Sequence, residues 1–201
     1  MSGQIYTIGY SGFKIDDFVS VLKGFGIAIL IDVRSMPYSM YFKSYNEKVL
    51  SATLSLSGIK YKNFKIEFGA RQENEELYTD GYLDFEKFAT SEQFQRGIRE
   101  VGVVVQNGKN LCLMCAEKDP LSCHRAVLCG KELYDGGFEV LHILSEKEGV
   151  ALEKHEELEK RLIELYFKNG VEQYDLFVSV QDKLKESYRL HNKKIGYRKK
   201  A

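Results

Sequence analysis

The stretch Ile27-Ala-Ile-Leu-Ile-Asp-Val-Arg34 decides the fold class of this chain. Its first five residues are apolar and do not alternate with polar ones, which is typical of a strand covered on both faces. Such strands belong to parallel sheets, whose crossover connections place helices over the sheet. The stretch therefore predicts an α/β protein, and it places a carboxylate and a guanidinium where the strand ends.

The same pattern continues along the chain. Short β-rich runs predict strands at residues 5–9, 27–33, 59–64, 111–114 and 138–144, and apolar residues at helical spacing predict helices at 14–23, 46–56, 82–88, 91–105 and 120–135. Residues 67–80 are charged and irregular. Alternating strands and helices favour parallel pairing. We therefore expect a mostly parallel five-stranded sheet with helices on both faces.

Beyond residue 146 the sequence predicts only helices, at 148–168 and 174–191. We expect an α/β domain over residues 1–146 that contains the site, and a helical extension over residues 147–201. From Lys183 onward the extension has eight Lys or Arg residues against one Glu. This basic tail predicts either a contact with nucleic acid or another acidic surface, or a solvated chain end.

The composition is that of an ordinary globular protein. The chain has 201 residues, of which 44% are hydrophobic and 29% charged, with a formal net charge of zero. The start Met1-Ser-Gly-Gln-Ile-Tyr6 is unlike a secretion signal, and no apolar run is long enough for a membrane span. We expect a cytoplasmic protein with no membrane partner, whose thiols are reduced.

The chain has four cysteines, at positions 112, 115, 123 and 129. Clustered cytosolic cysteines indicate metal binding, catalysis or core packing. Cys112-Leu-Met-Cys115 lies in a predicted strand, where residues three apart point to opposite faces, which argues against a zinc knuckle. We expect Cys112 and Cys129 to be small core residues.

Polar residues follow several of the predicted strands. In parallel sheets ligands bind beyond the carboxyl ends of the strands. The segments at those ends are Gly9-Tyr10-Ser11, Asp32-Val33-Arg34, Glu67 to Arg71, and Cys115-Ala116-Glu117. We expect Tyr10, Ser11, Arg34 and Arg71 to bind substrate there, although each arginine could instead pair with a nearby carboxylate.

The densest stretch runs from Cys115 to Arg125. Asp119-Pro120 predicts a helix start, which attracts anions through free N–H groups and the helix dipole. Arg125 adds a fork-shaped donor for phosphate or carboxylate. A cysteine at such a place can have a lowered pKa, and Cys123 is the nearest.

Three interpretations of this stretch stay open. Cys115 or Cys123 could act as nucleophile or redox thiol, with His124 and Glu117 moving protons. Alternatively Cys115, Cys123 and His124 could ligate a metal, with Glu117 or water as the fourth ligand. His124 could also serve only to hydrogen-bond the loop. A cysteine facing an anion cradle is similar to the arrangement in rhodaneses and cysteine phosphatases, but the spacing from Cys115 to Arg125 does not match their signature.

The chain also resembles the uncharacterised family numbered 488 among domains of unknown function. The resemblance rests on Thr7-Ile-Gly-Tyr-Ser-Gly12, Ile31-Asp-Val-Arg-Ser35 with Pro37, Phe68-Gly69 with Arg71, and Met114-Cys-Ala-Glu-Lys-Asp-Pro120 leading to Cys123-His-Arg125. These blocks cover about the first 145 residues. The resemblance implies a compact α/β domain whose motif residues belong together, and it implies no activity.

The leading hypothesis is an enzyme that acts on a small anionic or nucleotide-like substrate. Its catalytic residues would be Cys115, Cys123, His124 and Glu117, and its binding residues Tyr10, Ser11, Arg34, Arg71 and Arg125. The alternatives are a nucleic-acid-associated protein, a metal-binding Cys/His protein and a binding module without catalysis. Cofactor and oligomeric state stay open.

Overall fold

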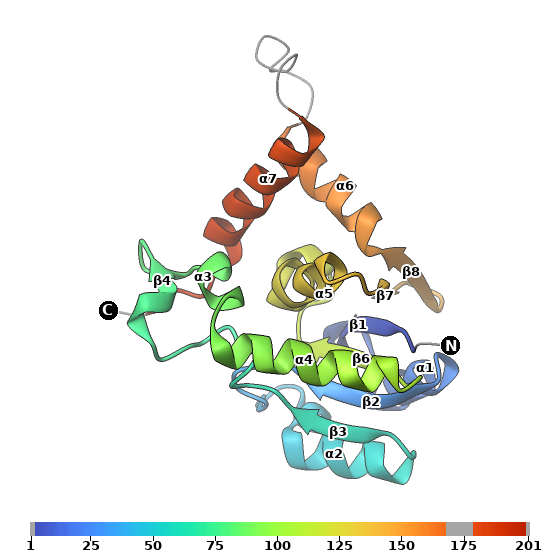
Figure 1. The fold of residues 1–201 in the computed structure, drawn as a ribbon. Helices are drawn as coiled ribbons and strands as arrows, with labels where there is room; N and C mark the ends of the chain where they lie inside the picture. The colour runs from blue at the N-terminus through green and yellow to red at the C-terminus, as the bar shows by residue number, and fades with distance from the viewer. Residues whose placement is uncertain (1–2, 168–178, 200–201) are drawn as a thin grey trace.

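A computed structural model describes residues 3–167 and 179–199 (Figure 1). Its main sheet has six strands in the order β3-β2-β6-β1-β7-β8. The strands are β1 (Ile5–Gly9), β2 (Ile27–Asp32), β3 (Lys60–Asn63), β6 (Asn110–Cys115), β7 (Val140–Ser145) and β8 (Val150–Lys154). All neighbours pair in parallel except β7 and β8, which are antiparallel. The predicted α/β class and mostly parallel sheet are confirmed, and the predicted number of strands was one too few.

The sixth strand, β8, occupies residues that the sequence analysis assigned to the helix at 148–168. Gly149 has a φ of 86°, which permits a tight reversal after β7. Strand β8 then pairs antiparallel with β7, with Val150 opposite Ser145 at one end and Lys154 opposite Leu141 at the other. Leu152 is 45% exposed, so it does not share a buried face with the leucines of the helix that follows. That helix, α6 (His155–Tyr166), begins only after the strand.

Helices cover both faces of the sheet. The helices are α1 (Ile15–Gly24), α2 (Glu47–Leu56), α3 (Phe85–Ala89), α4 (Glu92–Gln106), α5 (Lys131–Asp135), α6 and α7 (Val180–Ile195). Apolar residues of α1 and α2 pack in one core with Cys112 and Met114 of β6. Residues of α4, α5 and α6 pack in the other core with Leu113 and Cys115. Cys112 and Cys115 therefore point to opposite faces, as predicted.

The segment 120–135 is not the single helix that its spacing predicted. A 3₁₀ turn spans Pro120–Ser122, a π-helix spans Arg125–Gly130, and only Lys131–Asp135 is α-helical. Asp119 does cap the turn, accepting a hydrogen bond from the backbone N–H of Leu121 at 3.0 Å. Cys123 then has extended backbone angles, φ −143° and ψ 136°, which interrupt the helix. The helix start is therefore shifted from Asp119 to the residues after Cys123, and π-helices of this kind are frequent at functional sites.

The C-terminal residues pack against the rest of the chain. The boundary predicted at residue 146 falls between β7 and β8, which share one sheet. Helix α7 packs against α6, and Leu83 donates a backbone hydrogen bond to Tyr197 at 2.9 Å. Leu83 ends β5 (Tyr82–Leu83), which forms a hairpin with β4 (Tyr78–Thr79). The helix predicted at 82–88 therefore begins only with α3, because residues 82–83 form a strand. Residues 174–178 of the predicted helix 174–191 lie outside the described residues.

A buried hydrogen-bonded chain ties these C-terminal helices to the sheet. Its contacts join Thr7 Oγ1 to His142 Nδ1 at 2.8 Å, His142 Nε2 to His155 Nδ1 at 3.0 Å, and His155 Nε2 to the Tyr188 hydroxyl at 3.1 Å. Tyr188 in turn donates to Glu159 at 3.1 Å. We call Thr7, His142, His155, Tyr188 and Glu159 the histidine relay. Within the described ranges, no helix has the length and apolar character needed to cross a bilayer.

Candidate functional site

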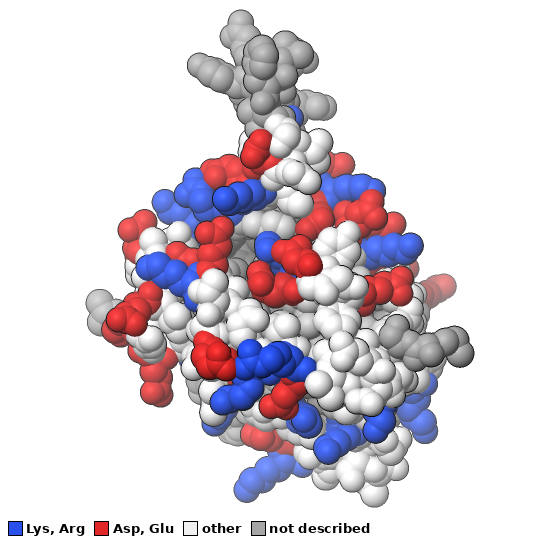
Figure 2. Space-filling view, in the orientation of Figure 1, with Lys and Arg blue, Asp and Glu red and all other residues white. Residues whose placement is uncertain are grey.

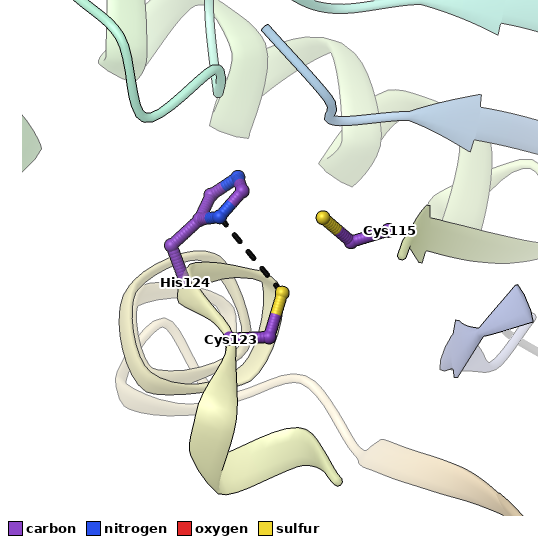
Figure 3. Close-up of side chains that lie close together, drawn as sticks. All are labelled: Cys115, Cys123 and His124. Atoms are coloured by element: carbon purple, nitrogen blue, oxygen red, sulfur yellow. Dashed lines mark hydrogen bonds between the residues drawn. The ribbon is translucent and has the colours of Figure 1, made fainter. Parts of the chain in front are cut away.

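Three side chains from two segments converge beyond the end of β6 (Figure 3). Cys115 is the last residue of that strand, and Cys123 and His124 precede the π-helix. Their ligand atoms, the two sulfurs and an imidazole nitrogen, all lie within 4.8 Å of one another. The loop after β6 therefore folds back over the strand end, because the break at Cys123 turns its sulfur inward.

The cluster lies at a cavity of about 490 Å³. Cys115 and Cys123 are only 4% and 2% exposed, so their sulfurs form the floor of the cavity rather than its rim. The cavity is lined by Tyr10, Arg34, Ser35, Met36, Tyr38, Ser39, Ala70, Arg71, Cys115, Ala116, Glu117, Ser122, Cys123, His124, Ile195 and Tyr197. Its size suits a small organic ligand.

The surroundings of Cys123 favour a thiolate. The backbone N–H of Arg125 points to its sulfur at 3.4 Å, and His124 Nδ1 lies 3.8 Å from the same sulfur. Burial alone would raise the pKa of Cys123. The hydrogen bond from the Cys115 thiol and the charges of Arg125 and His124 outweigh burial and hold this pKa well below its usual range. The same hydrogen bond, together with burial, raises the pKa of Cys115 well above its usual range.

His124 is held in one orientation by the main chain. Its Nε2 lies 3.1 Å from the carbonyl oxygen of Val33, which has no proton to donate, so Nε2 carries the hydrogen. Nδ1 therefore faces Cys123. Burial opposes a charge on this ring, but the neighbouring Cys123 sulfur outweighs it and raises the pKa of His124. The hydrogen bond to the Val33 carbonyl thus positions the His124 ring beside the Cys123 sulfur.

The two arginines that line the cavity differ in their partners. Arg34 is ion-paired with Asp32 at 2.6 Å and donates to the carbonyl of Tyr45 at 2.7 Å. Its Nη1 is buried and lacks a hydrogen-bond partner within the described ranges. Arg71 is exposed, stacks on Tyr197 at 5.0 Å and has no carboxylate partner in the part of the chain that the structure describes. Arg71 therefore brings an unneutralised charge to the cavity.

Arg125 and Ser11 are close to the site but do not line the cavity. Arg125 is fully buried and donates to the carbonyls of Glu117 at 2.7 Å and Lys118 at 3.2 Å. The backbone N–H of Ser11 donates to the carbonyl of Ala116 at 3.1 Å. A Cβ on Gly9 would lie 1.7 Å from the carbonyl oxygen of Glu117, so this position has room only for glycine. These residues hold the loop 116–118 over the strand end.

Glu117 and Tyr10 both face the cavity. Burial of the carboxyl and the nearby Cys123 sulfur raise the pKa of Glu117. Tyr10 is buried, stacks on Tyr45 at 4.3 Å and has Arg34 5.1 Å from its ring centre. Both residues line the cavity, and their roles in substrate binding and proton transfer stay predictions.

Sequence reasoning missed part of the wall. Met36, Tyr38 and Ser39 follow β2 directly, and the aromatic and Met residues of this loop could have indicated a binding segment. Ile195 and Tyr197 come from the end of α7, some 70 residues beyond His124, and no local pattern marks them. They reach the cavity only because α7 packs back on the domain.

A family model described as "Domain of unknown function DUF488" matches residues 14–131. This range includes Arg34, Arg71 and the cluster of Cys115, Cys123 and His124. Tyr10 lies before it, and Ile195 and Tyr197 lie beyond it. No curated protein and no solved structure matches the chain.

Proposed function

We propose a function for this chain, which belongs to the DUF488 family of unknown activity, from the chemistry of its site. The protein is an enzyme that attacks a small anionic or nucleotide-like substrate with the sulfur of Cys123. The observation that carries this proposal is the position of that sulfur, between His124 Nδ1 and the Arg125 N–H at the floor of a cavity lined by two arginines.

The substrate would be bound by its negative charge. Arg71 supplies an exposed charge, and Arg34 supplies a buried donor without a partner among the described residues. Tyr10, Tyr38 and Tyr197 line the same cavity and offer ring faces to a planar group such as a nucleobase. Charge and rings together favour a small anion that carries a flat or apolar part.

The chemical step would be a nucleophilic displacement by the Cys123 sulfur. The Cys123 thiolate forms a bond to an electrophilic atom of the substrate, and the leaving group departs with the bonding electron pair. Glu117, whose raised pKa lets it keep a proton longer than a solvated carboxyl, protonates the leaving group. His124 holds the thiolate by its charge, and Cys115 supports it through its thiol hydrogen bond.

The proposal is tested by alkylating the full chain with iodoacetamide near neutral pH, in the presence of chelator and reductant. Peptide mass spectrometry measures the rate at each cysteine. We expect Cys123 to react at least about tenfold faster than a free model thiol. The variant Cys123→Ser should lose the fast phase, and Cys112→Ala, a change in the opposite core, should keep it. If none of the four cysteines reacts faster than the model thiol, the proposal is wrong.

A nucleic-acid partner has less support. Arg198 stacks on Tyr82 at 5.4 Å and Lys199 on Tyr78 at 4.5 Å, so these two cations of the basic tail already contact the β4–β5 hairpin. Basic and acidic side chains are interspersed over the face shown in Figure 2, rather than gathered by sign. Binding of this protein to nucleic acid stays a prediction, which a salt-dependent retention on DNA or RNA would support.

A further inference from the structure

The three residues at the cavity floor also form a set of soft metal ligands. We infer that Cys115, Cys123 and His124 bind Zn²⁺ reversibly and that the bound metal silences the Cys123 thiol. The silencing part rests on the function proposed above, and the metal site itself does not. Two sulfurs and an imidazole are a combination that zinc takes in sites with three protein ligands and one open position.

The distances between the ligand atoms fit such a site after small side-chain rotations. From the usual Zn–S and Zn–N bond lengths, tetrahedral ligand atoms lie about 3.6 to 3.8 Å apart. Cys123 Sγ and His124 Nδ1 are 3.8 Å apart, and the whole set lies within 4.8 Å. The set therefore has to contract by about 1 Å at most, which χ rotations of two cysteines can supply.

The hydrogen-bond partners of His124 and Cys123 resemble those that surround the ligands of metal sites in proteins. A ligating histidine usually donates its second ring N–H to a carbonyl or carboxylate, and the Nε2 of His124 faces the carbonyl of Val33 at 3.1 Å. The imidazole is thereby held with Nδ1 toward the sulfurs, and this nitrogen can ligate a metal once it has lost its proton. The backbone N–H of Arg125 points to the Cys123 sulfur at 3.4 Å, which supports a charged thiolate ligand.

The fourth position would face the cavity. Glu117 lines that cavity beside the two cysteines, so a carboxylate or a water molecule can complete the tetrahedron. Zn²⁺ with two thiolates is a neutral group, which a buried floor accepts more readily than a lone thiolate. Cys112 cannot join the set, because it packs in the core on the opposite face of the sheet.

Binding and silencing follow from the same atom. The metal takes the lone pair of the Cys123 sulfur that would otherwise attack a substrate. The thiol proton of Cys115 and the Nδ1 proton of the charged His124 ring are released to solvent. No oxidant or reductant takes part, so removal of the metal restores the free thiol. The site would thus exist in a metal-filled silent form and a metal-free reactive form.

Cobalt substitution tests the metal site directly. The full chain, stripped with chelator under a thiol-free reductant, is titrated with Co²⁺ and then with Zn²⁺. We expect one equivalent of Co²⁺ to give a thiolate-to-cobalt charge-transfer band with the visible bands of a tetrahedral ion, and Zn²⁺ to abolish both. Cys123→Ser, Cys115→Ser and His124→Ala should each weaken binding by at least about tenfold, whereas Cys112→Ala should not.

Protection of the wild-type chain separates the two proposals and needs no variant to fold. We expect one equivalent of Zn²⁺ to slow alkylation of Cys123 at least about tenfold, and chelator to restore the rate. Fast alkylation in chelator without a cobalt band would overturn the metal site and leave the proposed function. A cobalt band with unprotected Cys123 would overturn the silencing. A cobalt band with a slow thiol in chelator would overturn the proposed function and leave the metal site.

Discussion

Two of the buried clusters that contain histidine differ in what their polar atoms contact. The cluster of Cys115, Cys123 and His124 borders a cavity of about 490 Å³, and the histidine relay reaches a cavity of about 470 Å³ through Tyr188 and Glu159. In the relay each ring nitrogen of His142 and His155 has a partner within 3.1 Å. In the first cluster the imidazole faces a sulfur at the cavity floor, and Arg34 keeps a donor without a partner among the described residues.

A buried histidine or a cavity of ligand size is therefore not sufficient to identify a functional site. A buried polar network whose members are all paired stabilises the fold and makes its arrangement unique. A cluster that leaves a reactive or donating atom open to a cavity can bind and transform a ligand.

The largest effect is expected from removal of His142. His142→Ala leaves Thr7 and His155 without their partners and opens space in the buried interior beside β7, so the free energy of unfolding should fall by about 3 to 5 kcal/mol. Urea unfolding followed by circular dichroism measures the change. Thr7→Val removes only the hydrogen bond between Thr7 and His142, and it should lower the free energy of unfolding by less than half as much. Equal losses would contradict the role of the relay.

Acid should destabilise the protein through the relay. Burial lowers the pKa of His155 to about 4, and it lowers the pKa of His142 well below its usual range. The unfolded chain, with histidine pKa values of about 6.5, then binds protons first as the pH falls. Stability should be fully present above pH 6.5 and should decrease toward pH 4, with His155 alone accounting for about 3 kcal/mol.

Unfolding in urea at several pH values between 7 and 4 measures this dependence. Tyr188 and Glu159 contact His155. Burial raises the pKa of Glu159, so this carboxyl takes up its proton in the folded protein first and partly opposes the loss of stability as the pH falls. The variant His155→Gln separates their contribution from that of the ring. If the slope below pH 6.5 is as steep in His155→Gln as in the wild type, the buried neutral ring is not its cause.

An intermediate effect is expected at Gly9, which shapes the reactive cluster. A Cβ at this position would meet the carbonyl oxygen of Glu117 at 1.7 Å, so Gly9→Ala must displace the loop that follows Cys115. We expect a loss of about 2 kcal/mol in unfolding free energy and a slower alkylation of Cys123. Gly24→Ala is the matched control, because a Cβ there meets nothing within 4 Å. The same outcome for both variants would show that the loop is not held at Gly9.

The smallest effect is expected at Arg71. Iodoacetate is an anion and iodoacetamide is neutral, so the ratio of their rates at Cys123 reports the charge of the cavity. Arg71→Gln should lower this ratio about threefold without changing stability, because its charge is exposed and screened. Arg96 is an exposed arginine on α4 that is paired with Glu67, and Arg96→Gln should leave the ratio unchanged. An unchanged ratio in Arg71→Gln would remove Arg71 from the anion site.

Sequence alone determined the layered architecture of this protein. The apolar run at 27–31 and the alternation with helices predicted the parallel sheet, because the residues of a strand that is buried on both faces are apolar without alternation. Period-two geometry also placed Cys112 and Cys115 on opposite faces. The carboxyl-end rule then brought Tyr10, Arg34, Arg71 and Cys115 to one cavity.

Only the tertiary structure decided which of the predicted groups can act. Strand β8 exists because the edge of β7 is available for pairing, a fact that the helix-like spacing at 148–168 does not contain. Arg125 does not line the cavity but donates a hydrogen bond to the Glu117 carbonyl of the loop after β6. Tyr197, which is far from the other lining residues in the sequence, forms part of the cavity wall. Residue type determines which groups can bind or react, whereas the contacts that satisfy or expose them form only when distant segments pack together.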